Sequence, residues 1–76
     1  MAVTIYTTPT CGYCNMAKDY FKKNNVQFTE FNVAQDRAKA EEMVRKSGQM
    51  GVPVIDINNE IIVGFNKSAV DKALKR

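Results

Sequence analysis

The stretch AVTIYTTPTCGYCNMAKDYF (residues 2–21) joins a strand, a short loop and a helix, and the rest of the chain is organised around it. Residues 2–6 are β-branched and aromatic, which predicts a strand in a central position. Residues 7–10 interrupt this pattern. From Cys11 onward, apolar residues recur at spacings of three and four, as in a helix with one buried stripe. The expected stripe comprises Tyr13, Met16, Ala17, Tyr20 and Phe21.

Similar local signals place the remaining elements. Three more strands are expected at residues 26–33, 54–57 and 60–63. The capping side chains of Asp36 and Asn66 each predict the start of a helix, and Gly48 predicts the end of the first of these two. Asn58-Asn59 suits a tight hairpin turn. The order β-α-β-α-β-β-α implies an α/β fold, with one parallel strand pair at the start and an antiparallel hairpin near the end.

Length and composition favour one small domain over residues 1–76. The chain is 45% hydrophobic, which is enough for a core and argues against disorder. It has no histidine, which excludes serine–histidine and cysteine–histidine catalysis and imidazole metal ligands.

Charge and hydropathy predict a cytoplasmic protein without membrane or nucleic-acid partners. The net charge is +3, but basic and acidic residues alternate along the helices, as on a solvated face. No apolar run approaches the roughly 20 residues that cross a bilayer, and the first residues have no signal-peptide pattern. A monomer is expected.

The motif Cys11-Gly12-Tyr13-Cys14 is the strongest functional signal. Cys11 falls at the expected cap position of the first helix, where unpaired N–H groups and the helix dipole favour a thiolate and lower the thiol pKa. Cys11 is therefore the expected nucleophile toward a substrate disulfide, and Cys14, one turn further into the helix, is the expected resolving thiol. Gly12 leaves room for substrate, and Tyr13 is expected at the surface as a docking residue.

Two other interpretations of the cysteine pair remain open. A structural zinc site needs four ligands, and the chain has two cysteines and no histidine, so no metal site is expected within one chain. A homodimer that shares an iron–sulfur cluster or a metal through Cys11 is the alternative function. Two inert buried cysteines are a third possibility, but CxxC beside a βαβ pattern is a strong redox signal.

The segment TTPTCGYC (residues 7–14), with Ala17-Lys18 after it and GVP (residues 51–53) after the second helix, resembles the glutaredoxins, a family with the thioredoxin-like fold. The resemblance covers essentially the whole chain. It implies a four-stranded mixed sheet of order 2-1-3-4 with three helices. It also implies a redox-active disulfide between Cys11 and Cys14, and no bound cofactor.

The same resemblance assigns further substrate-binding positions. It implies that Pro53 follows a cis peptide bond and lies against the disulfide, and that the backbone of Val52 pairs with substrate. Thr8 stands near the place where glutaredoxins commonly have a lysine before the first cysteine.

The C-terminal part departs from the glutaredoxin pattern. Glutaredoxins commonly have two glycines followed by Cys-Asp-Asp or a similar sequence, which holds the γ-glutamyl carboxylate of glutathione, whereas residues 63–68 read VGFNKS. This part is similar to the redoxins that serve ribonucleotide reductase and take electrons from a thioredoxin-reductase-type flavoprotein. The expected partners are therefore a disulfide-containing protein, such as ribonucleotide reductase or a peroxidase, and an electron donor that is either this flavoprotein or glutathione.

Overall fold

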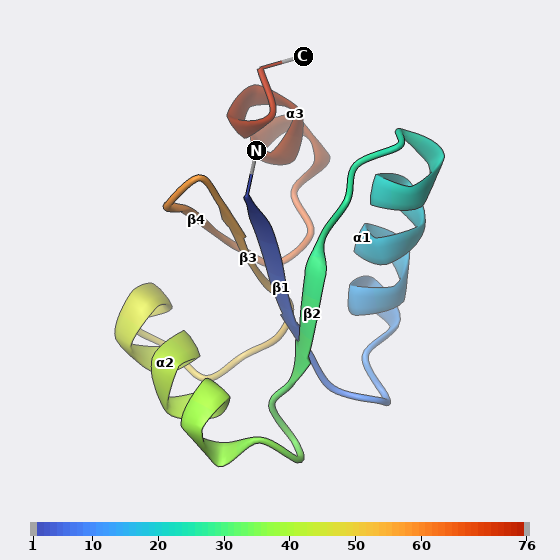
Figure 1. Ribbon diagram of the computed structural model, residues 1–76. Helices are drawn as coiled ribbons and strands as arrows, with labels where there is room; N and C mark the ends of the chain where they lie inside the picture. Colours follow the sequence, from blue (N-terminus) through green and yellow to red (C-terminus); the bar gives the residue numbers. More distant parts are fainter. Residues whose placement is uncertain (1, 76) are drawn as a thin grey trace.

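The computed structural model describes residues 2–75 as one sheet flanked by three helices (Figure 1). The strands are β1 (Val3–Thr7), β2 (Thr29–Asn32), β3 (Val54–Ile57) and β4 (Glu60–Val63). The helices are α1 (Gly12–Lys23), α2 (Arg37–Ser47) and α3 (Lys67–Ala73). The expected order of elements is confirmed.

The sheet has the order β2-β1-β3-β4, which confirms both the central place of β1 and the arrangement that the family resemblance implies. Strand β1 runs parallel to β2 and antiparallel to β3, and β3 and β4 form the antiparallel hairpin. Asn58 and Asn59 turn this hairpin with φ of 51° and 73°, as their sequence predicts.

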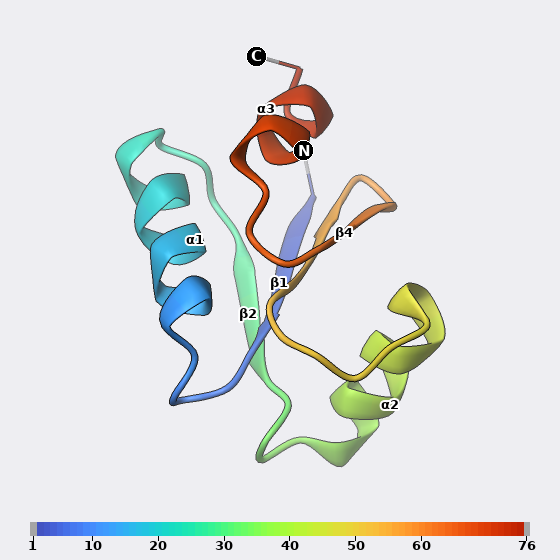
Figure 2. The same cartoon turned by 180° about the vertical axis from the view of Figure 1, so that it is seen from behind.

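The two faces of the sheet carry separate cores. Helices α1 and α3 cover one face, where Ile5, Phe21, Ile55 and Val70 are fully buried among other apolar side chains (Figure 2). Helix α2 covers the other face over a smaller cluster around Tyr6. Alternation along each strand sends neighbouring residues to opposite faces, which explains why both layers are filled.

The helix starts follow the sequence closely. The side chains of Cys11, Asp36 and Asn66 cap α1, α2 and α3, each accepting a hydrogen bond of 3.1 Å from the backbone N–H three residues on. Gly48 ends α2 in the left-handed conformation, with φ of 75°. Each cap satisfies a backbone group that the helix leaves unpaired.

Strand β2 is shorter than residues 26–33. Asn25 has φ of 56°, and the N–H groups of Asn25 and Val26 still donate to Lys22 and Phe21 at the end of α1. This double hydrogen bond is the Schellman motif. The chain is therefore still closing the helix where a strand is expected, and pairing begins at Thr29.

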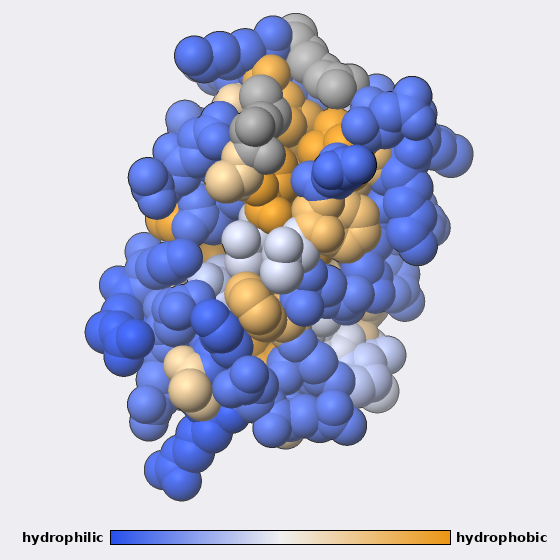
Figure 3. Space-filling model, in the orientation of Figure 1, coloured by the Kyte–Doolittle hydropathy of each residue, from blue (hydrophilic) through white to orange (hydrophobic). Residues whose placement is uncertain are grey.

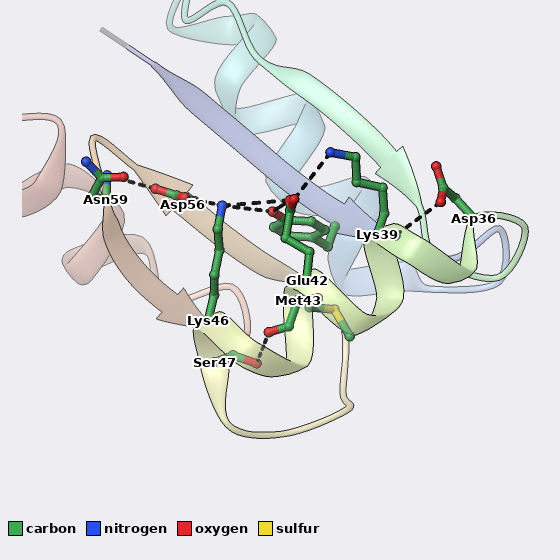
Figure 4. A network of polar contacts seen from close by, with 9 residues as sticks. Asp36, Lys39, Glu42, Met43, Lys46, Ser47, Asp56 and Asn59 are labelled. Carbon is green, nitrogen blue, oxygen red and sulfur yellow. Dashed lines mark hydrogen bonds and ion pairs between the residues drawn. The ribbon is translucent and has the colours of Figure 1, made fainter.

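A polar network ties α2 to the sheet (Figure 4). The ammonium of Lys46 lies 2.8 Å from Asp56 on β3 and donates to the hydroxyl of Tyr6 on β1 at 3.0 Å. That hydroxyl donates to Glu42, one turn before Lys46. Asp56 is buried and forms an ion pair with Lys46.

The outer surface is largely polar. Figure 3 shows a mostly hydrophilic face, with one larger apolar area toward the α3 end of the molecule. Within residues 2–75, no helix is long and apolar enough to cross a membrane.

Candidate functional site

The two cysteines lie at the start of α1, where residues 8–10 lead from the end of β1 into the helix. Cys11 is the cap residue, with φ of −93° and ψ of 109°, and its Sγ accepts a hydrogen bond of 3.1 Å from the N–H of Cys14. The Cys11 carbonyl accepts from Asn15 at 3.3 Å. The cap geometry expected from the sequence is therefore present, with a sulfur in the place of the usual oxygen acceptor.

The two sulfurs form a disulfide but differ in their access to solvent. Cys11 is partly exposed, whereas Cys14 is fully buried. An incoming disulfide can therefore reach the sulfur of Cys11, while the sulfur of Cys14 is shielded by the helix and the sheet. This inequality is what a nucleophilic and a resolving thiol require.

The N-terminus of α1, which carries the positive end of the helix dipole, faces the Cys11 sulfur. Helix α1 has no acidic residue in its first turn. The ammonium of Lys18, one turn beyond Cys14, lies 3.0 Å from Glu30 on β2, and the Lys18 side chain is 23% exposed. A hydrogen bond from the Thr7 hydroxyl and the Lys18 ammonium together hold the pKa of Glu30 below its usual value. Lys18 is thus neutralised locally, and the backbone amides remain as the stabilising group for a thiolate.

The Val52–Pro53 segment lies at the same end of the sheet. Strand β3 runs antiparallel to β1, and Val54 pairs with Tyr6, so the residue before β3 comes next to the loop that follows β1. The Val52–Pro53 peptide bond is cis, as the family resemblance implies. Pro53 is buried and Val52 is half-buried, and the Pro53 carbonyl accepts from Gly64 at 2.8 Å. The Val52–Pro53 segment and Gly64 therefore lie at the end of the sheet from which the loop after β1 leads to the cysteines.

The other expected contact residues have clear positions. Gly12 is exposed, and a Cβ at this position would have no neighbour within 4 Å. Tyr13 is 66% exposed, in line with a docking role rather than a place in a buried stripe. Thr8 is half-buried, and its carbonyl accepts from the N–H of Cys11 at 3.3 Å.

Met16 departs from the prediction of a buried stripe. It is 52% exposed and lines a hollow of about 410 Å³ together with Gly12 and Tyr13. The buried line of α1 runs instead through Cys14, Ala17 and Phe21, which keep helical spacing. The exposed start of α1 thus carries an apolar surface that the sequence pattern assigns to the core. The surface position expected for Tyr13 could have indicated that Met16 is exposed, because Tyr13 and Met16 lie three residues apart on one helix face.

Within residues 2–75, no three cysteine, histidine or acidic side chains gather where they could hold a metal ion.

Comparisons with known proteins give a consistent result. The glutaredoxin family model matches residues 3–62. An uncharacterized glutaredoxin-like 8.6 kDa protein in the rubredoxin operon of Clostridium pasteurianum is 49% identical over 74 residues, covering 97% of this chain and 99% of that protein. Glutaredoxin 3 of Escherichia coli is 42% identical over 62 residues, covering 82% and 75% of the two chains.

A solved structure links the chain to a second group of redoxins. NrdH-redoxin from Escherichia coli, described as a glutaredoxin-like protein with a thioredoxin-like activity profile, superposes with a TM-score of 0.85 at 26% identity. The match covers 95% of this chain and 93% of that one.

Proposed function

This chain belongs to the glutaredoxin family, and we propose that it is a small dithiol electron carrier that reduces protein disulfides through Cys11 and Cys14. The observation that carries the proposal is the pair of sulfurs at the start of α1, one partly exposed and one fully buried. A capping sulfur that accepts a backbone N–H is held where a thiolate is stabilised.

The reaction begins with the reduced protein. The Cys11 thiolate attacks one sulfur of the substrate disulfide, which forms a mixed disulfide and expels the other substrate sulfur as a thiolate that takes a proton from water. Cys14 then loses its proton to water, and its thiolate attacks the sulfur of Cys11. The bond between Cys11 and the substrate breaks, the second substrate sulfur leaves as a thiolate that takes a proton from water, and the Cys11–Cys14 disulfide remains. Two electrons have moved from the protein to the substrate.

The electron donor that fits best is a thioredoxin-reductase-type flavoprotein. In glutaredoxins, two glycines followed by Cys-Asp-Asp or a similar sequence commonly hold the γ-glutamyl carboxylate of glutathione at the start of the last helix, and residues 63–68 of this chain (VGFNKS) lack that sequence. Here the first N–H groups of α3 face Asn66, whose side chain already accepts from Ala69. The similarity to NrdH-redoxin also supports a flavoprotein as the electron donor. A ribonucleotide reductase or a peroxidase is the corresponding candidate substrate.

The roles of the cysteines are tested by the Cys14→Ser variant, with Cys11→Ser as the matched control. Cys14→Ser keeps the backbone N–H that donates to the Cys11 sulfur, so this variant should still attack a protein disulfide but stop at the mixed disulfide. Mass spectrometry should detect this adduct, and turnover should be lost. Cys11→Ser should give no adduct. Full turnover of a protein disulfide by Cys14→Ser would disprove the resolving role.

The donor is tested by following NADPH consumption with the oxidised protein. One reaction contains a thioredoxin-reductase-type flavoprotein, and the other contains glutathione and glutathione reductase. We expect faster turnover with the flavoprotein. Exclusive use of glutathione would overturn the donor assignment but leave the dithiol mechanism intact. A purified protein that is a coloured, iron-containing dimer would support the alternative function as a shared-cluster module.

A further inference from the structure

We propose that a groove along α1 docks a segment of the partner protein that carries apolar and acidic side chains next to its reactive disulfide. This inference rests on the proposed function. The groove, called here the α1 groove, begins beside the cysteines and continues toward the segment between β4 and α3, which faces α1 in Figure 2.

Two adjoining hollows form the α1 groove, and Met16 belongs to both. The first, of about 410 Å³, is lined by Gly12, Tyr13 and Met16. The second, of about 280 Å³, is lined by Met16, Asp19, Tyr20, Lys23, Phe65 and Lys67. Because the first hollow contains the two residues between the cysteines, a chain bound at the Cys11 sulfur can continue directly into the groove.

The groove exposes the side-chain types that form the centres of protein interfaces. Tyr13 and Met16 are 66% and 52% exposed. Aromatic residues and methionine are enriched in interface cores, and the flexible thioether of methionine adapts to different apolar partners. Two such side chains side by side on the helix that carries the reactive sulfur favour contact with apolar residues of a substrate.

The far end of the groove is already ordered. The rings of Tyr20 and Phe65 lie 5.8 Å apart between centroids, and the Tyr20 hydroxyl donates to Asp71 of α3. Phe65 also packs against the core on this side of the sheet. This pair therefore forms a fixed apolar floor, so a partner segment binds without first ordering it.

The charge of the groove favours an acidic partner. The ammonium of Lys67 lies 5.4 Å from the centroid of the Tyr20 ring. Within residues 2–75, neither Lys23 nor Lys67 forms an ion pair with an acidic side chain. The lining residues include two lysines and one aspartate, Asp19, so the lining itself has one positive charge in excess. The nearby carboxylate of Asp71 accepts a hydrogen bond from the Tyr20 hydroxyl. A carboxylate on the partner gains most by binding between the two lysines.

A third hollow, of about 430 Å³, lies along α2 and is a competing docking surface. It is lined by Arg37, Arg45 and the exposed Met50, among others, but it includes neither cysteine nor the residues between them. Arg37 also lies 3.9 Å from Glu41, which reduces its free charge. The observations therefore favour the α1 groove, and Met50 provides a matched control.

The test uses the reduced full chain as the sole reductant in single-turnover reactions. Two synthetic peptides share one intramolecular disulfide and carry a tail of six residues, either leucine with aspartate or leucine with lysine. Six extended residues, at about 3.3 Å each, exceed the roughly 14 Å that α1 rises from Cys14 to Lys23. Bis(2-hydroxyethyl) disulfide, which is too small to reach the groove, serves as the reference. Each rate constant for a peptide is divided by that for the reference.

We expect the acidic-tailed peptide to be preferred at low salt and the preference to shrink at high salt. Lys67→Glu should lower the preference by about two- to five-fold, within the range that exposed charge contacts give. Glutamate at the first position of a helix suits the helix dipole, so folding should be retained. Lys72→Glu, on the same helix but outside the groove, should keep the wild-type preference. Met16→Gln should slow both peptides, and Met50→Gln should slow neither.

Three results would overturn the proposal. They are equal rates for the two tails, an equal loss of preference in Lys67→Glu and Lys72→Glu, and slowing by Met50→Gln rather than Met16→Gln, which would place docking on α2. In all three the reference disulfide is still reduced, so the dithiol function stands. Failure of the wild type to reduce the reference would overturn the proposed function itself.

Discussion

Replacing Lys46 by methionine should destabilise the protein by about 2 kcal/mol, because α2 depends on polar contacts for its attachment. Among the residues that the structure describes, α2 fully buries Met43 alone. Lys46 binds Asp56 at 2.8 Å and Tyr6 at 3.0 Å. These two hydrogen bonds raise the pKa of Lys46 well above its usual value, so the stabilisation is complete at pH 7 and would fade only above about pH 10.

The magnitude follows from what Lys46→Met leaves behind. Asp56 has a side chain only 9% exposed and would lose its counter-ion. Breaking a buried ion pair costs roughly 3–5 kcal/mol. Lys46 itself is 35% exposed, so water can partly replace it, which reduces the expected cost to about 2 kcal/mol. The other bond of Asp56, from the Asn59 N–H at 2.8 Å, is unaffected.

Urea unfolding of the oxidised protein at pH 7 measures this cost, and a double-mutant cycle assigns it. Asp56→Asn keeps an oxygen to accept from Asn59 but removes the charge, so adding it to Lys46→Met should recover about half of the loss. A cost for Lys46→Met below about 0.5 kcal/mol, or strictly additive effects, would refute the claim that this pair holds α2 to the sheet.

Two further substitutions test the surroundings of the cysteines. Gly12→Pro should keep disulfide formation and raise the free energy of unfolding by about 0.5–1 kcal/mol. Proline suits the first helical position, and Cys11 already has the extended backbone that a residue before proline requires. A lower free energy of unfolding in urea would contradict this prediction. Thr7→Val should cost about 1 kcal/mol at neutral pH by removing the hydroxyl donor to Glu30. Since the folded pKa of Glu30 is lowered, the difference from wild type should shrink as the pH falls below about 4, and a difference that does not depend on pH would contradict the assignment.

The features that the sequence predicts correctly are those determined by neighbouring residues. The caps at Cys11, Asp36 and Asn66 each depend on one side chain and the N–H three residues later. The hairpin turn at Asn58-Asn59 likewise needs only two residues that tolerate positive φ. The place of Cys11 at the start of α1, with Cys14 one turn further along the helix, is therefore predictable from the sequence.

The features that escape prediction depend on segments far apart in the sequence. The partners of Lys46 and Lys18 lie on strands that the folded sheet brings to them, so composition and spacing give no signal for either pair. Met16 has the right spacing for the buried stripe. However, the sheet covers the line through Cys14 and Ala17, and only the direction in which α1 packs decides between the two lines. The cis bond before Pro53 was predicted from the family resemblance, and residue spacing alone gives no indication of it.

The most direct test of the account is the ionisation of Cys11 in the reduced protein. It is measured by the pH dependence of thiolate absorbance, with Cys14→Ser isolating the signal. The hydrogen bond from the Cys14 N–H and the positive end of the helix dipole both favour the thiolate of Cys11. We predict a pKa below the ordinary cysteine value of about 8.5, together with fast alkylation at neutral pH. A pKa at or above about 8.5 would show that the start of α1 does not activate this sulfur, and the account of the protein as a dithiol electron carrier would fail.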